Sequence, residues 1–431
     1  MPEANQVTMS ATLAADEAIA RRRAAGESVL SMASGEIGLP VHPGLRARLA
    51  EAADLGSYGP VAGSPELREA AAGYWDRRGL ATTADQVVCG PGSKPMLFAL
   101  LLAVGGDVVI PTPSWVSYAA QAGLIGVRHF PVPTLPGQGG VPDPDRLRET
   151  VAAARAAGHD PRSVIVTLPD NPTGTIAVPE TVRRLAEAAR ELDLVVVSDE
   201  IYCDLVYDLV ATPAVSPAVF APERTVVTTG LTKNLAIGGW RTGVARLPAG
   251  ETGQRLRERL VGVASQIWSS PAAPVQAAAA YAFAEPDEIV EHIAASRRLH
   301  ETVTRAMAER FAAAGAVLEP VVATCYLYPD FEPLRAHLAE AHGVRTGADL
   351  AALLVERYGV GLLPASAFGE AEESLRLRVA TSRLYGDTEE RCQAALHAED
   401  PLALDWIRAS LDRVEEVLAD LTAGAAVPIP A

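Results

Sequence analysis

The sequence is poor in lysine. Among 431 residues only two are lysine, Lys94 and Lys233. A coding bias that replaces lysine by arginine explains the depletion, but it does not explain where the two remaining lysines lie. Any chemistry that requires a side-chain amine therefore has two candidate residues.

Positive charge is also scarce overall. There are 37 basic and 53 acidic residues, which gives a net charge of −16. Binding to nucleic acid requires clustered positive charge, so we expect no nucleic-acid partner. No run of about 20 uncharged apolar residues is present, and the N-terminal segment is interrupted by Asp16, Glu17 and Arg21. We therefore expect neither a membrane span nor a signal peptide.

Cysteine is scarce and unpaired in the sequence. The four cysteines are Cys89, Cys203, Cys325 and Cys392. Their spacing matches neither a zinc site nor a disulfide framework, so we expect no metal and a reducing, cytoplasmic location.

The length favours two or three domains, and 49% hydrophobic residues with 21% charged residues are ordinary for a globular chain. Short apolar runs are predicted as strands at 86–89, 107–111, 163–168, 194–198 and 225–228. Helical patterns lie between them, for example over 95–104 and 179–191. Buried strands that alternate with helices predict an α/β fold with a mostly parallel sheet and helices on both faces.

The pattern changes towards the C-terminus. A long helix predicted over 286–314 precedes short strands near 317–329 and 376–380 and helices over 346–358 and 401–422. Together with an N-terminal helix over 10–26, these elements predict a smaller α+β domain. We expect residues 50–300 to form the large domain, and residues 1–49 and 301–431 to form the small one.

The first candidate for chemistry is Lys233. It follows an apolar strand in a stretch rich in hydroxyl and glycine residues, and Arg241 lies eight residues further on. Such a lysine can form a Schiff base with an aldehyde cofactor, while the arginine holds an anionic group of that cofactor. From this segment alone, a surface lysine in a loop is the favoured interpretation.

Three further motifs follow predicted strands. They are Gly90–Lys94 (Gly-Pro-Gly-Ser-Lys), Asn171–Gly174 (Asn-Pro-Thr-Gly) and Asp199–Tyr202 (Asp-Glu-Ile-Tyr). The first can bind phosphate at a helix N-terminus, and the other two lie where ligands bind in open α/β sheets. Taken singly, each can equally be an ordinary turn or cap.

Taken together and in this order, the motifs resemble the pyridoxal phosphate (PLP) enzymes of fold type I. The likeness is to the class I/II aminotransferases, and within them to the bacterial aspartate and aromatic aminotransferase subgroup. It extends from about residue 9 to 385. It implies a large domain with a mostly parallel, seven-stranded-type sheet between helices, a smaller α+β domain, and a homodimer with shared active sites.

The resemblance also implies roles for individual residues. Lys233 matches the lysine that forms the internal aldimine and moves the substrate proton. Asp199 matches the acid that keeps the pyridine nitrogen protonated, so that the ring acts as an electron sink. Asn171 and Tyr202 match the residues that bind the phenolate oxygen. Trp115 lies where the family stacks an aromatic ring on the cofactor, although core packing is an alternative role.

The remaining matches concern phosphate and substrate. The residues implied to bind the cofactor phosphate are Gly92, Ser93, Lys94, Thr232, Arg241 and, from the neighbouring subunit, Tyr58. Arg376 lies at the spacing of the arginine that binds the substrate carboxylate, and Gly35 matches the loop glycine that closes over it. The choice of Arg376 over Arg378 rests on the resemblance, because next-but-one residues of a strand share a side.

The implied reaction is ping-pong transamination. An amino acid passes its amine to PLP through aldimine, quinonoid and ketimine stages, and a 2-oxo acid then takes the amine. The alternative on the same scaffold is β- or γ-elimination, replacement or cyclisation. Two departures from the family pattern keep this alternative open: the loop Gly35–Leu39 reads Gly-Glu-Ile-Gly-Leu, where the family usually has Gly-Glu-Pro-Asp-Phe, and the bulky Trp268 either narrows the pocket or packs. A non-enzymatic PLP-binding sensor is disfavoured, because no basic DNA-binding extension is present.

Overall fold

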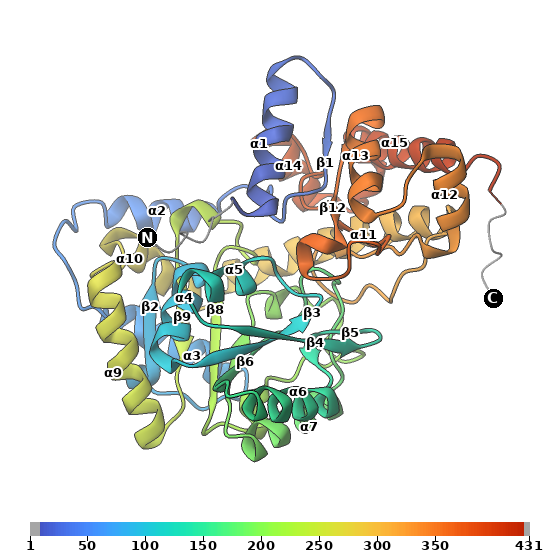
Figure 1. The fold of residues 1–431 in the computed structure, drawn as a ribbon. Helices are drawn as coiled ribbons and strands as arrows, with labels where there is room; N and C mark the ends of the chain where they lie inside the picture. The colour runs from blue at the N-terminus through green and yellow to red at the C-terminus, as the bar shows by residue number, and fades with distance from the viewer. Residues whose placement is uncertain (1–8, 426–431) are drawn as a thin grey trace.

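The structure is a computed structural model that describes residues 9–425, and an eight-stranded sheet forms its centre (Figure 1). The strands are β2 (Val87–Gly90), β3 (Asp107–Thr112), β4 (His129–Leu135), β5 (Gln138–Pro142), β6 (Pro161–Thr167), β7 (Val195–Asp199), β8 (Thr225–Gly230) and β9 (Gly243–Arg246). Their order across the sheet is β2-β9-β8-β7-β6-β3-β4-β5. The five strands from β8 to β4 are parallel, whereas β9 is antiparallel to both of its neighbours and β5 is antiparallel to β4. The predicted α/β class and mostly parallel sheet are confirmed, with one strand more than the seven expected.

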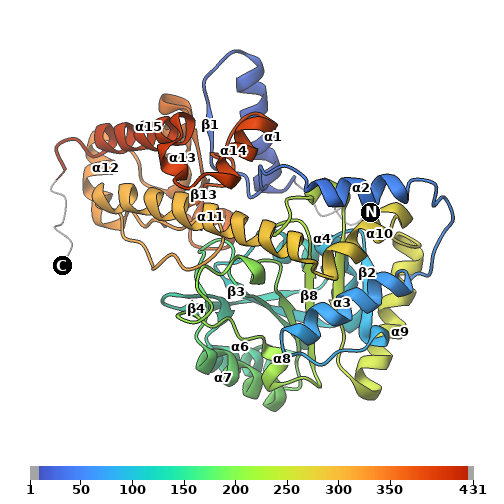
Figure 2. The same ribbon diagram turned by 180° about the vertical axis from the view of Figure 1, so that it is seen from behind.

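Successive residues of the strands face different layers of helices. In β3, Val108 and Ile110 pack with α4, α5 and α9, whereas Val109 between them packs with α6 and α7. At the other end of the sheet, α2, α3 and α10 cover the face that carries Val87 of β2 (Figure 2). The helices of this body are α2 (Pro43–Glu51), α3 (Pro65–Arg77), α4 (Ser93–Val104), α5 (Ser117–Leu124), α6 (Pro144–Ala156), α7 (Pro179–Glu191), α8 (Pro217–Phe220), α9 (Gly250–Ile267) and α10 (Ala273–Phe283).

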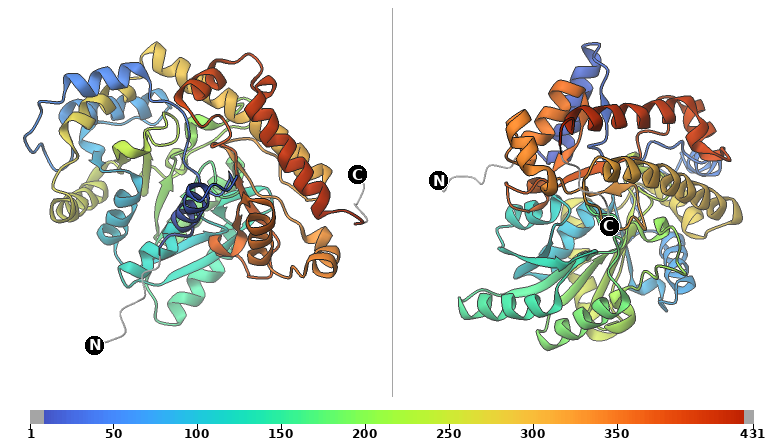
Figure 3. Two further views of the ribbon diagram at one scale, coloured as in Figure 1. Left: turned by 90° about the horizontal axis from the view of Figure 1, so that it is seen from above. Right: turned by 90° about the vertical axis from the view of Figure 1, so that its right-hand side faces the viewer.

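A second, smaller body combines the N-terminal segment with the C-terminal part of the chain (Figures 1 and 3). Its helices are α1 (Ala11–Ala24), α11 (Asp287–Ala313), α12 (Arg335–His342), α13 (Gly347–Tyr358), α14 (Glu389–His397) and α15 (Asp405–Leu421). Its strands are β1 (Leu30–Ser31), β10 (Tyr326–Leu327), β11 (Val360–Gly361), β12 (Leu363–Pro364) and β13 (Leu377–Ala380). β1 pairs with β11, while β13 lies between β10 and β12.

Two helices cross the limits that the sequence predicts for the domains. α2 spans residues 49 and 50, and its Leu45 is buried in the core of the larger body. α11 continues unbroken through residues 300 and 301, and it runs along both bodies (Figure 2). Residues 1–8 and 426–431 of the predicted small domain lie outside the described residues. Among residues 9–425, no helix is long and apolar enough to cross a membrane.

The arrangement of the strands places the motifs. Because β6, β7 and β8 are parallel neighbours, the segments that follow them emerge at one edge of the sheet. These segments carry Asn171, Asp199, Tyr202 and Lys233. The start of α4 lies at the same edge, and α1 and β13 of the smaller body face it.

Candidate active site

A cavity of about 410 Å³ lies between the carboxyl ends of the central strands and the smaller body. It collects most of the site residues predicted from the sequence: Gly35, Ser93, Lys94, Trp115, Asn171, Asp199, Tyr202, Thr232, Lys233 and Arg241. Because these residues come from segments far apart in the sequence, their convergence on one cavity argues against ordinary turns and caps.

Lys233 lies in the turn that follows β8. Its Nζ donates a hydrogen bond to the backbone carbonyl of Gly35, at 2.5 Å. Burial lowers the pKa of the Lys233 amine to about 8, because the charged form loses its hydration. At pH 7 about a tenth of the amine is therefore neutral, far more than for an ordinary lysine, and only the neutral form is a nucleophile.

Asp199 ends β7 and is 3% exposed. The Tyr118 hydroxyl donates to its Oδ2 at 2.9 Å, and the Thr228 hydroxyl donates to its Oδ1 at 3.3 Å. Burial raises the pKa of this carboxyl to about 6, although both hydrogen bonds act in the opposite direction. A buried carboxylate held by hydroxyl groups fits a cationic ring nitrogen, which would supply the missing positive charge.

The first turn of α4 forms an anion-binding end of the cavity. Gly92 precedes it with φ of 102°, and a Cβ at this position would lie 2.5 Å from Nη2 of Arg241. A glycine is therefore needed for Arg241 to lie against the helix N-terminus. The free amides of this turn, together with Thr232 and Arg241, suit a phosphate group.

Lys94 and Trp115 line the same end. The Lys94 Nζ is 5.1 Å from the centroid of the Trp115 ring. Burial and the nearby Arg241 lower the pKa of the Lys94 amine. Trp115 also packs edge-on against Tyr118, with the ring centroids 5.3 Å apart. The indole thus has both roles considered from the sequence, since it lines the cavity and packs on the core.

Two tyrosines, Tyr202 and Tyr326, line the cavity together with Asn171 and Arg378. The hydroxyl groups of Tyr202 and Tyr326 are 2.9 Å apart. Arg378 donates from Nη1 to Oδ1 of Asn171 at 3.0 Å, and from Nη2 to the carbonyl of Ala33. Because its Oδ1 is used in this contact, the NH₂ group is what Asn171 can offer to a ligand.

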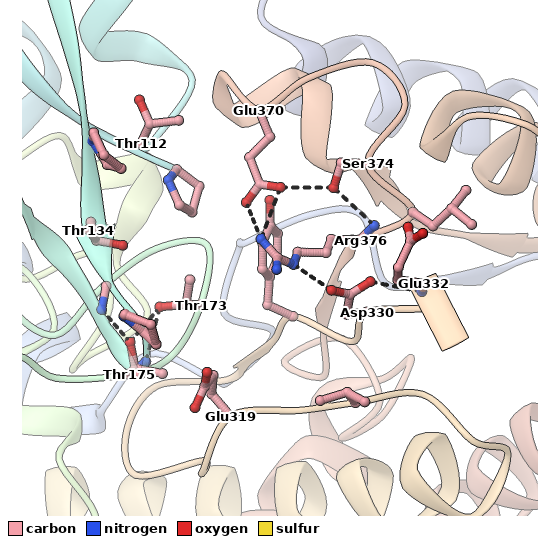
Figure 4. A pocket seen from close by; sticks show the side chains of 18 of the residues that line it. Thr112, Thr134, Thr173, Thr175, Glu319, Asp330, Glu332, Glu370, Ser374 and Arg376 are labelled. Atoms are coloured by element: carbon pink, nitrogen blue, oxygen red, sulfur yellow. Dashed lines mark hydrogen bonds and ion pairs between the residues drawn. The ribbon is translucent and has the colours of Figure 1, made fainter. Parts of the chain in front are cut away.

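The prediction for Arg376 requires a correction. This arginine lies outside the cavity, and its half-exposed side chain bonds Asp330 at 2.9 Å and Glu370 at 3.3 Å in a separate cleft (Figure 4). Arg378 instead lines the cavity, is 1% exposed, and has an Nε without a hydrogen-bond partner among the described residues. Arg376 lies directly before β13, where it forms an antiparallel bridge with Asp330, whereas Arg378 lies within the strand.

The structure also resolves two other sequence questions. Trp268 packs over Gly90 and against the apolar core that includes α4. The tryptophan does not line the cavity, so it does not narrow the substrate pocket. Tyr58 is 88% exposed and lies away from the cavity of its own chain.

Sequence reasoning missed Tyr118 and Tyr326. Tyr118 lies three residues after Trp115, and such a pair on a helical turn shares a face, so this signal was present. Tyr326 lies in a two-residue strand that no sequence motif marks. No group of His, Cys, Asp or Glu in the described part of the chain is placed to hold a metal ion.

The comparisons with known proteins agree with this geometry. The family model for aminotransferase class I and II matches residues 28–394. The chain belongs to the class I and II aminotransferases. A probable aspartate/prephenate aminotransferase of Thermus aquaticus is 32% identical over 338 residues, which cover 77% of this chain and 85% of that protein. The aspartate aminotransferase of Geobacillus stearothermophilus is 31% identical and covers 87% of this chain and 93% of its own length.

A solved structure shows the same fold. The aspartate aminotransferase from Thermus thermophilus with maleate superposes with a TM-score of 0.80, at 27% identity, over 95% of this chain and 97% of that one. The aminotransferase is thus a PLP-dependent transferase of fold type I. Its cavity fits the cofactor, because it offers an amine of lowered pKa, a buried carboxylate and a helix N-terminus for phosphate. The match to aminotransferases also favours amine transfer over the elimination, replacement or cyclisation that the sequence left open.

Proposed function

We propose that Arg378 binds the α-carboxylate of the amino acid and that Lys233 moves the proton during amine transfer. Bound PLP supplies an aldehyde that accepts the amine and a ring that withdraws electrons from the substrate α-carbon. The Lys233 Nζ would take the proton from the substrate α-carbon and deliver it to the carbon of the former aldehyde group, so that the amine stays with the cofactor and a 2-oxo acid leaves. Asp199 holds a proton on the ring nitrogen, while Asn171 and Tyr202 bind the phenolate oxygen.

The environment of Arg378 carries this proposal. Its guanidinium is fixed by Asn171 and by the carbonyl of Ala33, and it stacks 5.0 Å from the Tyr326 ring centroid and 4.9 Å from that of Phe368. Arg378 lines the cavity, and its Nε has no hydrogen-bond partner among the described residues. A planar guanidinium held in this way can orient a carboxylate through charge-assisted hydrogen bonds. It thereby fixes the α-carbon relative to Lys233.

We also propose a dicarboxylic α-amino acid such as aspartate as the amino donor. The relatives described above are named for aspartate, and Arg378 in the cavity suits a substrate carboxylate. The acidic Glu36 in the cavity wall is paired with Arg383 at 3.0 Å, and Arg383 also faces Asp16. The two acidic groups are thus partly compensated from outside the substrate space.

The same proposal includes a cytoplasmic homodimer. Tyr58 and Leu55, between α2 and α3, are large exposed apolar side chains, as expected of a surface that a second subunit covers. Tyr58 would then reach the phosphate end of the partner's cavity. The described cysteines are all free thiols, which fits a reducing compartment.

The test compares Arg378→Lys with Arg376→Lys, two matched changes in one short segment. With aspartate as donor, Arg378→Lys should lower kcat/KM roughly 100-fold, because lysine cannot reproduce the hydrogen bonds of a fixed guanidinium. Arg376→Lys should change it less than about threefold, since its ion pairs lie outside the cavity. Both variants should keep the visible absorbance of bound PLP, and that absorbance should vanish in Lys233→Ala.

Three results would contradict the proposal. Equal losses in the two arginine variants would remove Arg378 from its role, as would full activity of Arg378→Lys. A kcat/KM for alanine that matches that for aspartate would contradict the choice of donor.

A further inference from the structure

A buried hydrogen bond joins the two segments that carry Tyr202 and Lys233. Asp204 lies two residues after Tyr202, in the 3₁₀ turn Cys203–Leu205, and its side chain is 8% exposed. Its Oδ2 accepts a hydrogen bond from Nδ2 of Asn234 at 2.7 Å. Asn234 follows Lys233 directly and is 4% exposed. This single contact therefore connects the neighbours of two residues that face the cofactor site.

The backbone around Lys233 has little regular structure to hold it. β8 ends at Gly230, and residues 231–237 form an irregular turn. The backbone hydrogen bond that closes this turn, from the Ile237 amide to the Leu231 carbonyl, is 3.5 Å long, and Ala236 adopts a φ of 56°. A lysine side chain is long and flexible, so its Nζ is only as well placed as its backbone. The Asn234 amide provides a short anchor immediately beside it.

Asp204 is itself held firmly from the other side. Arg78 donates from Nη2 to its Oδ1 at 2.8 Å, and the Tyr74 hydroxyl donates to its Oδ2 at 3.1 Å. The Arg78 guanidinium stacks 3.5 Å from the centroid of the Tyr74 ring and also pairs with Glu285 at 2.5 Å. The carboxylate is thus neutralised by Arg78 and fixed to the C-terminal end of α3.

The effect of Asp204 on Lys233 is one of position more than of charge. After burial, the main groups that shift the Lys233 pKa are Cys325, Arg378, Glu36 and Asp199. The link from Asp204 runs through a neutral amide, and the charge of Asp204 is matched by Arg78.

We propose that Asp204 and Asn234 are positioning residues for the reaction, which hold the Lys233 backbone at a fixed distance from Tyr202. The inference rests on the proposed role of Lys233 as the proton carrier. Neither side chain lines the active-site cavity, and neither touches the reacting atoms.

The experiment is a double-mutant cycle on the PLP-loaded enzyme with Asn234→Ala, Asp204→Asn and both together. In the wild type, Arg78 and Asn234 donate to different oxygens of the Asp204 carboxylate. An asparagine at this position has one oxygen that accepts and one NH₂ group that only donates, so it cannot keep both hydrogen bonds in the same geometry. Each single variant should lower kcat about 10- to 100-fold and leave the amino-acid KM within about threefold, since a displaced catalytic group costs rate at saturation. The double variant should be no slower than the slower single one, because both changes remove the same contact.

A spectroscopic readout separates positioning from general destabilisation. In each variant the pH at which the visible absorbance of bound PLP titrates should shift, because Lys233 is displaced from the groups around the cofactor. The control, Asp193→Asn, changes a carboxylate that is 97% exposed, and it should alter neither kinetics nor spectrum.

Unchanged kcat and unchanged titration in folded Asn234→Ala would overturn the inference, as would losses that multiply in the double variant. If Asn234→Ala does not fold, Asp204→Asn decides alone by the same two measurements. A wild-type protein without visible absorbance in the presence of PLP would instead contradict the role of Lys233 and the proposed function.

Discussion

Burial by itself prepares Lys233 for covalent chemistry. Its pKa falls from an ordinary value of 10.5 to about 8, chiefly because the ammonium form is desolvated. At pH 7 roughly one such amine in ten is neutral, compared with roughly one in 3,000 for an exposed lysine. The nearby Asp199 changes in the opposite sense, because burial raises the pKa of a carboxyl.

This shift predicts the pH dependence of cofactor attachment. The rate at which the cofactor-free enzyme gains visible absorbance with PLP should rise to about pH 8 and then level off, as Lys233 becomes fully neutral. Nα-acetyl-lysine, a control with a free side-chain amine, should continue to react faster with PLP up to about pH 10. Between pH 8 and 10.5 the unfolded chain binds a proton at Lys233 that the native state lacks, so this residue makes native stability increase with pH. An enzyme rate that follows the control would contradict the shift.

The residues that could be predicted are those that follow strands in the order of the motif. Asp199 ends a parallel strand, and Asn171 and Lys233 follow two others, so their convergence follows from topology. Arg376 and Arg378 could not be told apart by geometry, because the sequence does not show that Arg376 pairs with Asp330 and Glu370, whereas Arg378 reaches Asn171. Tyr326 reaches the site only through the packing of the smaller body.

Among the elements, strands were predicted where apolar runs were continuous, whereas β4, β5 and the short β9 were missed. β4 contains Pro131 and Pro133 and is nevertheless paired on both sides, with β3 and β5. Proline lacks the amide that a central strand donates, so its presence argued against a strand. The long helix α11, in contrast, was predicted to within a residue at each end, because its pattern is long and periodic.

The loop between β1 and α2 is an element whose conformation the sequence could not supply. Gly35 lies so close to Tyr326 that a Cβ would be 2.2 Å from the tyrosine hydroxyl oxygen. The Gly38 amide bonds the carbonyl of Ser382 at 3.2 Å, which ties the loop to the segment after β13. Through Tyr326 the loop is in contact with Tyr202, and through the Gly35 carbonyl with Lys233.

Gly35→Ala should therefore disturb the active site more than the fold. The added methyl group must displace either the loop or the Tyr326 hydroxyl, and we expect kcat/KM to fall about 10- to 100-fold. The midpoint of thermal unfolding should stay within a few degrees of the wild type. Gly262→Ala, at a position with open space for a Cβ, is the control and should retain full activity. Wild-type kinetics of Gly35→Ala would show that the close approach has no functional consequence.

At the scale of the whole molecule, the cavity is built from both bodies. The sheet supplies Asp199 and Lys233, whereas the smaller body supplies Arg378, Tyr326 and the α1 residues Thr12 and Asp16. Neither body alone encloses a substrate. Tyr58 is exposed on its own chain, and in the homodimer that we propose it would complete the cavity of the neighbouring subunit.

Subunit complementation tests whether the active sites are shared. Lys233→Ala and Tyr58→Ala chains should each have little activity alone, the first without its amine and the second with a weakened hold on the phosphate. If the chains are unfolded and refolded together in equal amounts, half of the dimers should be mixed, and each mixed dimer should contain one intact site. Activity should then recover to about a quarter of that of the wild type. This recovery requires that Tyr58 and Lys233 of one site come from different chains. No recovery would mean that each subunit completes its own site. A monomer in solution would exclude shared sites altogether.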